Sequence, residues 1–344
     1  MTPLRCPAHS RLPVLASSLL LVAIAGCSTT KTDNGSVAGM PTPIRMELSG
    51  AGASFPAPLY KRWFDELAQQ GVGVRFQSVG SGTGLQQFTY NLVDFAASDV
   101  PMKPAEVARE RRGVVQIPMT AGALVVAYQH KGCDLKLSQA QLAGIFQGTI
   151  TDYGALGCQA KPIRLVVRAD GSGTTANLTA HLAAISPSWK RQVGAGKLVK
   201  WPVGTQAKGT EGVVNQLRTT DGAMGVVEAS MAQPPLQAAA LTNGAGQMMD
   251  PTLDNQKAAL ASIDLGPELT GRNPNPQAGY PLVTFSWILL PKTGNGETHQ
   301  KTIQTVFGYG LSQPAQAIAE EMGYVGLPEA VRKKSLAALA TVQP

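Results

Sequence analysis

The sequence predicts an α/β fold, in which strands and helices alternate along the chain, and three observations support this. From Met46 onward, segments with the two-residue period of strands alternate with segments of helical period, and the turns between them are short. The apolar run 163–167 leads through a glycine-rich turn straight into a helical pattern. The chain has 344 residues, 44% hydrophobic and 15% charged, which suits a globular protein with one large core or two medium ones.

Helices are predicted where apolar residues recur three or four positions apart. The first carries Leu59, Trp63 and Leu67. It begins near Pro56 and Pro58, because proline is tolerated in the first helical turn. The later helices are marked by Leu85, Phe88 and Leu92, by Ser138 as N-cap before Leu142, Ile145 and Phe146, by Leu178, Leu182 and Ile185, and by the stretches 297–310, 314–322 and 328–341.

Strands are predicted where apolar residues alternate with polar ones or form short runs. These segments are 74–76, 95–98, 114–117, 123–128 and 163–167, followed by a strongly apolar strand at 283–290. Residues 233–279 are rich in Gly, Pro, Asn and Gln, and the sequence predicts no structure for them.

The N-terminus has the pattern of an export signal. Arg5 and Arg11 precede a mostly apolar run that is too short to span a bilayer stably, and small residues then lead to Cys27. This pattern resembles a bacterial lipobox, which predicts a signal peptide over 1–26, lipid attachment at Cys27 and a flexible tether over 27–44. A plain secretory signal is the alternative. The predicted location is the periplasm or cell envelope, and the sequence leaves open which membrane holds the anchor.

The charge and the cysteines limit the possible functions and cellular compartments of the protein. Without residues 1–26 the chain has 27 basic and 22 acidic residues, a net charge of +5, and no run of Lys or Arg that would predict nucleic-acid binding. Cys133 and Cys158 are expected to form a disulfide in an oxidising compartment, worth about 3 kcal/mol. Two free buried thiols are the alternative. The spacing of His and Cys predicts no metal site, and no cofactor is expected.

Three segments predict an anion site. Residues 51–56, 79–84 and 168–174 each link a strand to a helix and place a hydroxyl side chain beside Gly or Ala at the helix start. The free N–H groups there, the helix dipoles and the Arg168 guanidinium would together favour an oxyanion. Any one segment alone is better explained as a helix cap. Asp99, which ends a strand-like segment, is by itself best explained as a turn or cap residue.

Taken with 93–99, 200–204, 208–209 and 222–228, these segments resemble the periplasmic phosphate-binding proteins of the high-affinity phosphate ABC transporter (Pst type). The resemblance covers most of 48–327, and 233–279 match poorly. It implies a type II periplasmic binding protein, with two α/β lobes joined by two crossing strands and the ligand in the cleft. The first implied lobe comprises residues 45–118 and 286–344, and the second comprises residues 119–285. The crossings would lie near 118–122 and 280–285, with the three late helices packed on the first lobe.

The resemblance also implies which residues contact phosphate. These are Ser54, Phe55, Ser81, Asp99, Arg168, Ser172, Gly173 and Thr174, with Asp170 holding Arg168 in place. The chain departs from the usual sequence of this family at three places. Ser54 replaces the usual Thr, residues 80–84 read Gly-Ser-Gly-Thr-Gly, and Val167 replaces a second arginine often found there.

Asp99 is the residue expected to distinguish anions. An ionised carboxylate only accepts hydrogen bonds, so it can face a phosphate oxygen that carries a proton but not a sulfate oxygen. The mismatch with sulfate would cost about 1–3 kcal/mol or more, whereas arsenate should be harder to exclude.

The implied function is high-affinity binding of inorganic phosphate and its delivery to ABC permease subunits in the inner membrane. The protein is expected to be a monomer that touches the membrane only through its lipid. Adhesion, matrix binding or phosphate signalling at the surface is the alternative role. An enzyme is not predicted, because Ser172 lacks the Gly-x-Ser-x-Gly context and the histidines are scattered. A phosphatase is the enzyme alternative.

Overall fold

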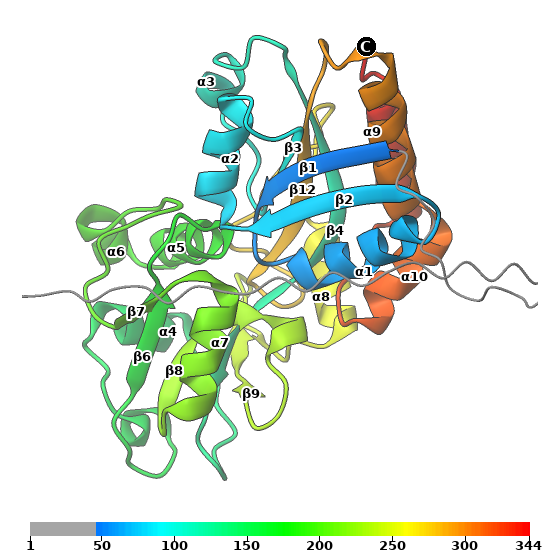
Figure 1. Ribbon diagram of the computed structural model, residues 1–344. Helices are drawn as coiled ribbons and strands as arrows, with labels where there is room; N and C mark the ends of the chain where they lie inside the picture. The colour runs from blue at the N-terminus through cyan, green and yellow to red at the C-terminus, as the bar shows by residue number, and fades with distance from the viewer. Residues whose placement is uncertain (1–45) are drawn as a thin grey trace, which may run out of the picture. The chain divides into compact units, whose positions relative to one another are not determined.

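The computed structural model describes residues 46–344, which belong to one compact unit (Figure 1). The predicted signal peptide, Cys27 and tether lie outside the described residues. Within 46–344, no helix combines the length and apolar character needed to cross a bilayer.

The main sheet of the described residues has nine strands, some parallel and some antiparallel. The strand order is β2-β1-β3-β12-β4-β8-β6-β7, and β9 pairs with β4. Its strands are β1 (Met46–Gly52), β2 (Val72–Ser78), β3 (Phe95–Ser98), β4 (Val114–Tyr128), β6 (Arg164–Arg168), β7 (Thr205–Ala207), β8 (Ala223–Glu228), β9 (Gln237–Ala238) and β12 (Val283–Pro291). A second sheet has three short strands, β5 (Lys136–Leu137), β10 (Ala240–Thr242) and β11 (Met248–Met249).

The large sheet contains two parallel groups joined by an antiparallel pair. β1 runs parallel to β2 and β3, and β6 runs parallel to β7 and β8. Between the groups, β12 is antiparallel to both β3 and β4, and β4 is antiparallel to β8. The predicted α/β alternation is therefore confirmed, because each parallel group uses helices to return the chain to its starting edge.

The strand β4 corrects one prediction. The sequence predicts two short strands at 114–117 and 123–128, but the structure has one strand of 15 residues that runs through Pro118. Proline lacks the N–H that a strand donates, so it is normally confined to edges and bulges. Here Pro118 lies opposite Trp287, where the register shifts between Ser286 and Trp287. This irregularity accommodates the proline, and β4 then continues from its pairing with β12 to its pairing with β8.

The helices of the described residues are α1 (Ala57–Ala68), α2 (Ser81–Thr89), α3 (Pro104–Val107), α4 (Gln139–Gln147), α5 (Gly173–Ile185), α6 (Pro187–Gln192), α7 (Gly209–Thr219), α8 (Leu253–Ala261), α9 (Gly296–Gly310), α10 (Gln313–Glu321) and α11 (Glu329–Leu339), with 3-10 turns η1 (Tyr153–Leu156) and η2 (Ala229–Met231). Seven helices of the described residues, α1, α2, α4, α5, α9, α10 and α11, lie on predicted stripes, whereas α3, α6, α7 and α8 were not predicted. The predicted cap at Ser138 is confirmed, because its hydroxyl accepts from the Gln141 N–H at 3.2 Å.

The prediction that Leu92 belongs to the second helix is wrong. α2 ends at Thr89, and Leu92 is 69% exposed. Asn91, just before it, has a φ of +56°, which is left-handed and incompatible with continuing a right-handed helix.

The three late helices pack against one another and beside the first parallel group. α9 lies beside β1 and contacts it and α1 (Figure 1). α10 contacts α1 and α9, and α11 contacts α9 and β4. Phe307 on α9 meets Phe95 on β3 edge to face, with ring centroids 5.0 Å apart, and both side chains are buried. The C-terminal segment therefore completes the core that the first strands begin.

Residues 233–279 form short elements that are bonded to the main body. The Trp287 indole N–H donates to the Leu269 carbonyl at 2.7 Å, and His181 Nδ1 lies 2.7 Å from the Pro274 carbonyl oxygen. The segment also contributes buried apolar side chains to the core, among them Leu236, Leu241 and Leu260, but these are spread over short elements, so its sequence shows no apolar period.

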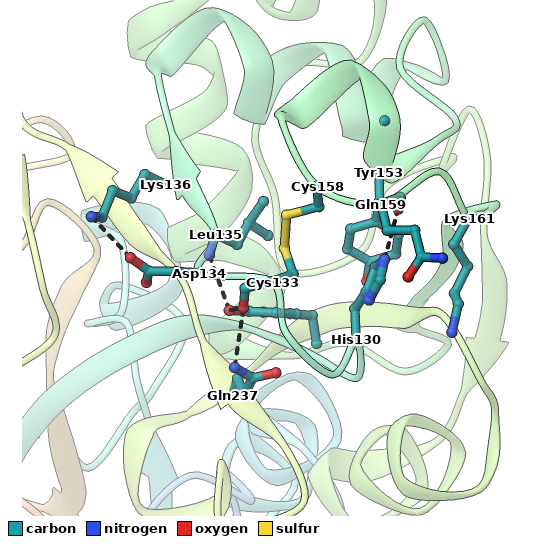
Figure 2. The surroundings of a disulfide bond; sticks show 12 residues. His130, Cys133, Asp134, Leu135, Lys136, Tyr153, Cys158, Gln159, Lys161 and Gln237 are labelled. Carbon is teal, nitrogen blue, oxygen red and sulfur yellow. Dashed lines mark hydrogen bonds and ion pairs between the residues drawn. A yellow bond between two sulfur atoms is a disulfide. The ribbon is translucent and has the colours of Figure 1, made fainter.

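Cys133 and Cys158 form a disulfide, with Cα atoms 5.3 Å apart (Figure 2). The predicted pairing is confirmed. The Cys133 carbonyl accepts hydrogen bonds from the Tyr128 hydroxyl at 2.9 Å and from Gln237 Nε2 at 3.1 Å. The disulfide therefore ties the segment after β4 to the turn η1.

The double replacement Cys133→Ser with Cys158→Ser is expected to lower the free energy of unfolding by about 3 kcal/mol, because it releases a loop with a sequence separation of 25. Urea unfolding of the oxidised wild type and the variant measures the loss. A wild type treated with reductant should match the variant, and equal unfolding midpoints for all three would contradict the prediction.

Candidate anion site

The site lies where strand ends from both parallel groups meet. β1, β2, β6 and β7 each lead within a few residues into a helix, α1, α2, α5 and α7 respectively. β3 ends beside Asp99, and β8 ends at Glu228. The carboxyl ends of parallel strands share one edge, where helix N-termini point free N–H groups outward. This arrangement is suited to binding an anion.

The turns of the two groups contact each other directly. The Gly82 N–H donates to the Gly171 carbonyl at 2.8 Å, and the Gly173 N–H donates to Ser81 Oγ at 3.2 Å. A β-carbon on Gly173 would lie 2.5 Å from the Asp99 β-carbon, which is too close for any side chain. The glycine therefore allows the start of α5 to approach Asp99.

Arg168 is held by Asp170 in a two-point ion pair. Its Nε and Nη2 lie 2.9 and 2.5 Å from the two carboxylate oxygens, and the Arg168 side chain is 4% exposed. Burial raises the pKa of Asp170, but Arg168 and the Gly209 N–H outweigh it, so the pKa lies below its usual value. Asp170 therefore stays ionised and fixes the guanidinium.

Asp99 is buried and bonded on several sides. Its Oδ1 accepts from the Ser286 hydroxyl at 2.8 Å, and its carbonyl accepts from Thr284 at 2.9 Å and from Asn177 at 2.8 Å. Burial raises the pKa of Asp99 to about 8, against the lowering effect of Ser286. The charge of Glu228 raises it further, and Arg168 lowers it. Burial therefore favours the protonated form of the Asp99 carboxyl near neutral pH, whereas the sequence-based expectation used the ionised form.

Thr210 and Glu228 connect the remaining hydroxyls. Ser54 Oγ lies 2.9 Å from Thr210 Oγ1, which lies 3.4 Å from Arg168 Nη1. Glu228 Oε1 accepts from Thr210 at 3.1 Å and from Thr174 at 3.2 Å. The hydroxyls of Ser54, Thr210 and Thr174 thus form one buried network with Arg168 and Glu228.

Sequence reasoning did not single out Thr210 or Glu228. Thr210 lies close to a helix start after a strand, as Ser54 and Ser81 do. That strand, β7, has only three residues and two of them are exposed, so it lacks an apolar signal. Glu228 appears only as the last residue of a matched segment, and nothing local marks its carboxyl as buried.

The other predicted site residues lie in the same region. The Ser172 hydroxyl accepts from the Thr175 N–H at 3.0 Å and so caps α5. Phe55 is buried next to Ser54, and its carbonyl accepts from the Tyr324 hydroxyl at 3.0 Å. The structure therefore gathers the predicted residues at one set of strand ends.

His181 lies on α5, buried against Pro274 rather than among these groups. Burial lowers its pKa. Among residues 46–344, no group of three metal-ligating side chains is found.

Comparison with known proteins identifies the protein family of the chain. The sequence profile of the PBP superfamily domain matches residues 30–313. The chain is 36% identical to the phosphate-binding protein PstS of Pasteurella multocida, over 83% of this chain and 88% of that protein. It is also 36% identical to PstS of Haemophilus influenzae, over 82% of this chain and 89% of that protein. The chain belongs to the PstS phosphate-binding proteins of this superfamily.

A solved structure supports the fold. A high-affinity periplasmic phosphate-binding protein (PfluDING) bound with phosphate superimposes with a TM-score of 0.71. It is 21% identical, over 85% of this chain and 93% of that one. The likeness confirms the predicted fold class.

Proposed function

We propose that this protein binds inorganic phosphate in the cell envelope and delivers it to an ABC importer. One observation carries the proposal: Arg168, fixed by Asp170, lies buried in a network with hydroxyls at the ends of strands from both parallel groups. A fixed guanidinium, helix N-termini and hydroxyl donors are the groups that bind phosphate oxygens. Membership of the PstS proteins supports both the ligand and the transport role.

The proposed contacts to phosphate come from the hydroxyls, N–H groups and charged side chains already placed. They are Ser54, Phe55, Ser81, Asp99, Arg168, Ser172, Gly173 and Thr174, with Asp170 orienting Arg168. Burial of the polar side chains among them supports this assignment, because buried polar groups need partners and an anion supplies several acceptors at once.

The first proposed lobe comprises residues 45–118 and 286–344, and the second comprises residues 119–285. Their support is the pairing of β4, which changes partner from β12 to β8 between Ala123 and Leu124. The anion would then lie between the lobes, contacted by residues of both.

We further propose a signal peptide over 1–26, a lipid on Cys27, a tether over 27–44, a monomeric state and docking to permease subunits.

Titration calorimetry of the purified protein tests the function. Phosphate is expected to bind with micromolar or better affinity near pH 7 and near pH 9, because phosphate carries a proton that can face Asp99 in either state. Sulfate has no proton of its own, so it requires the protonated carboxyl. With a pKa of about 8, the protonated fraction of Asp99 falls about tenfold between these pH values. The preference for phosphate over sulfate should rise by about the same factor.

Two outcomes would count against this proposal. An absence of heat with phosphate would reject the binding function. A preference over sulfate that does not change with pH would show that Asp99 does not face the anion.

A further inference from the structure

Glu228 is a second buried carboxyl in the site, and the proposed contacts to phosphate do not use it. It is 0% exposed at the end of β8. Its Oε1 accepts from Thr210 and Thr174, and among the described residues its Oε2 has no hydrogen-bond partner. An acidic group so close to an anion site requires an explanation, because an ionised carboxylate would repel the ligand.

The hydroxyls next to Glu228 can point in either of two directions. Each hydroxyl has one proton to donate. Ser54 and Thr210 lie 2.9 Å apart, and either oxygen can be the donor. When Glu228 is ionised it only accepts, so Thr210 donates to Glu228 and Ser54 donates to Thr210. The Ser54 proton is then turned away from the anion.

A proton on Glu228 reverses this chain. The carboxyl can then donate to Thr210, Thr210 can donate to Ser54, and Ser54 is free to donate to a bound anion. The same proton removes a negative charge from the buried site. Both effects favour anion binding, and both depend on one titrating group.

We propose that Glu228 is a positioning residue whose proton sets the direction of the chain Glu228–Thr210–Ser54, so that phosphate binds tightly only when Glu228 is protonated. This inference rests on the proposed phosphate-binding function. The ligand class is a phosphate-like oxyanion, and binding takes up a proton wherever Glu228 is ionised in the free protein.

The charged and titratable groups that face Glu228 come from several elements. Burial raises the pKa of Glu228, and Arg168 on β6 and the two threonine hydroxyls lower it. Asp99 after β3 and Tyr324 after α10 also sense its charge, since Glu228 contributes to raising the pKa of each. Asp99 and phosphate itself also titrate, so an experiment must separate Glu228 from them.

The test compares Glu228→Gln with the wild type, because the amide can donate to Thr210 at every pH and carries no charge. At the acid end of a pH series, where Glu228 is protonated, phosphate affinities of the two proteins should agree within about threefold. As the pH rises through the raised pKa of Glu228, the wild type should weaken relative to Glu228→Gln by about fivefold or more. Calorimetry in two buffers with different heats of ionisation should show greater proton uptake by the wild type. Titration of phosphate occurs in both proteins and cancels in the ratio. The pKa of Asp99 senses the Glu228 charge, so the comparison is repeated in an Asp99→Asn background, where Asp99 does not titrate.

Thr210→Val provides a second variant, which interrupts the chain but leaves the Glu228 charge. Its phosphate affinity should depend on pH less steeply than that of the wild type. A constant affinity ratio between wild type and Glu228→Gln over this pH range would overturn the inference, as would an unchanged pH dependence in Thr210→Val. An absence of phosphate binding by the wild type at every pH would instead reject the proposed function itself.

Discussion

Replacing Arg168 by alanine is expected to weaken phosphate binding by about a hundredfold or more, whereas Ser81→Ala should cost about tenfold or less. Arg168 supplies the full positive charge of the network described above, and its removal also leaves Asp170 without its ion-pair partner beside the anion. Ser81 contributes one hydroxyl, and the Gly173 N–H that now donates to it would remain available to the ligand. Calorimetric titration with phosphate measures both losses.

Arg168→Lys is the matched control for this comparison. It keeps the charge but cannot form two parallel bonds to Asp170, so its affinity should fall between those of the wild type and Arg168→Ala. Thermal unfolding without phosphate separates lost binding from lost folding. Equal losses for Arg168→Ala and Ser81→Ala would show that the charge has been assigned to the wrong residue.

Gly84→Ala is expected to lower the free energy of unfolding by about 3 kcal/mol or more, or to prevent folding. A β-carbon on Gly84 would lie 2.3 Å from the Gly52 Cα and 2.6 Å from the Ala51 carbonyl oxygen. Both are backbone atoms of β1, so the clash cannot be relieved by turning a side chain. It would push α2, which begins at Ser81, away from the strand end that precedes Ser54.

Gly308→Ala is the control, because Gly308 also lies in a helix, α9, and a β-carbon there meets nothing within 4 Å. Alanine should stabilise that helix by about 0.5–1 kcal/mol. Urea unfolding measures both variants. If Gly84→Ala proved as stable as the wild type, the packing of α2 against β1 would differ from that described.

Local features of the site were predictable from the sequence. Small and hydroxyl residues at a helix start obey rules that operate within a few positions, so the junctions at Ser54, Ser81 and Arg168 could be recognised one by one. The resemblance to a known family then indicated that they belong to a single site. Thr210 escaped notice because its strand is short and polar, and a helix start after such a strand has no distinctive local pattern.

The alternation of strands and helices, the helix caps and the residue types available to hold an anion could be predicted from the sequence, because each depends on neighbouring residues. Tertiary structure alone decided that β4 continues through Pro118, that Glu228 joins Thr210 and Thr174, and that burial raises the pKa of Asp99 to about 8. These depend on strand pairing and on removal from water by segments far away in the chain. No local pattern of residues encodes them.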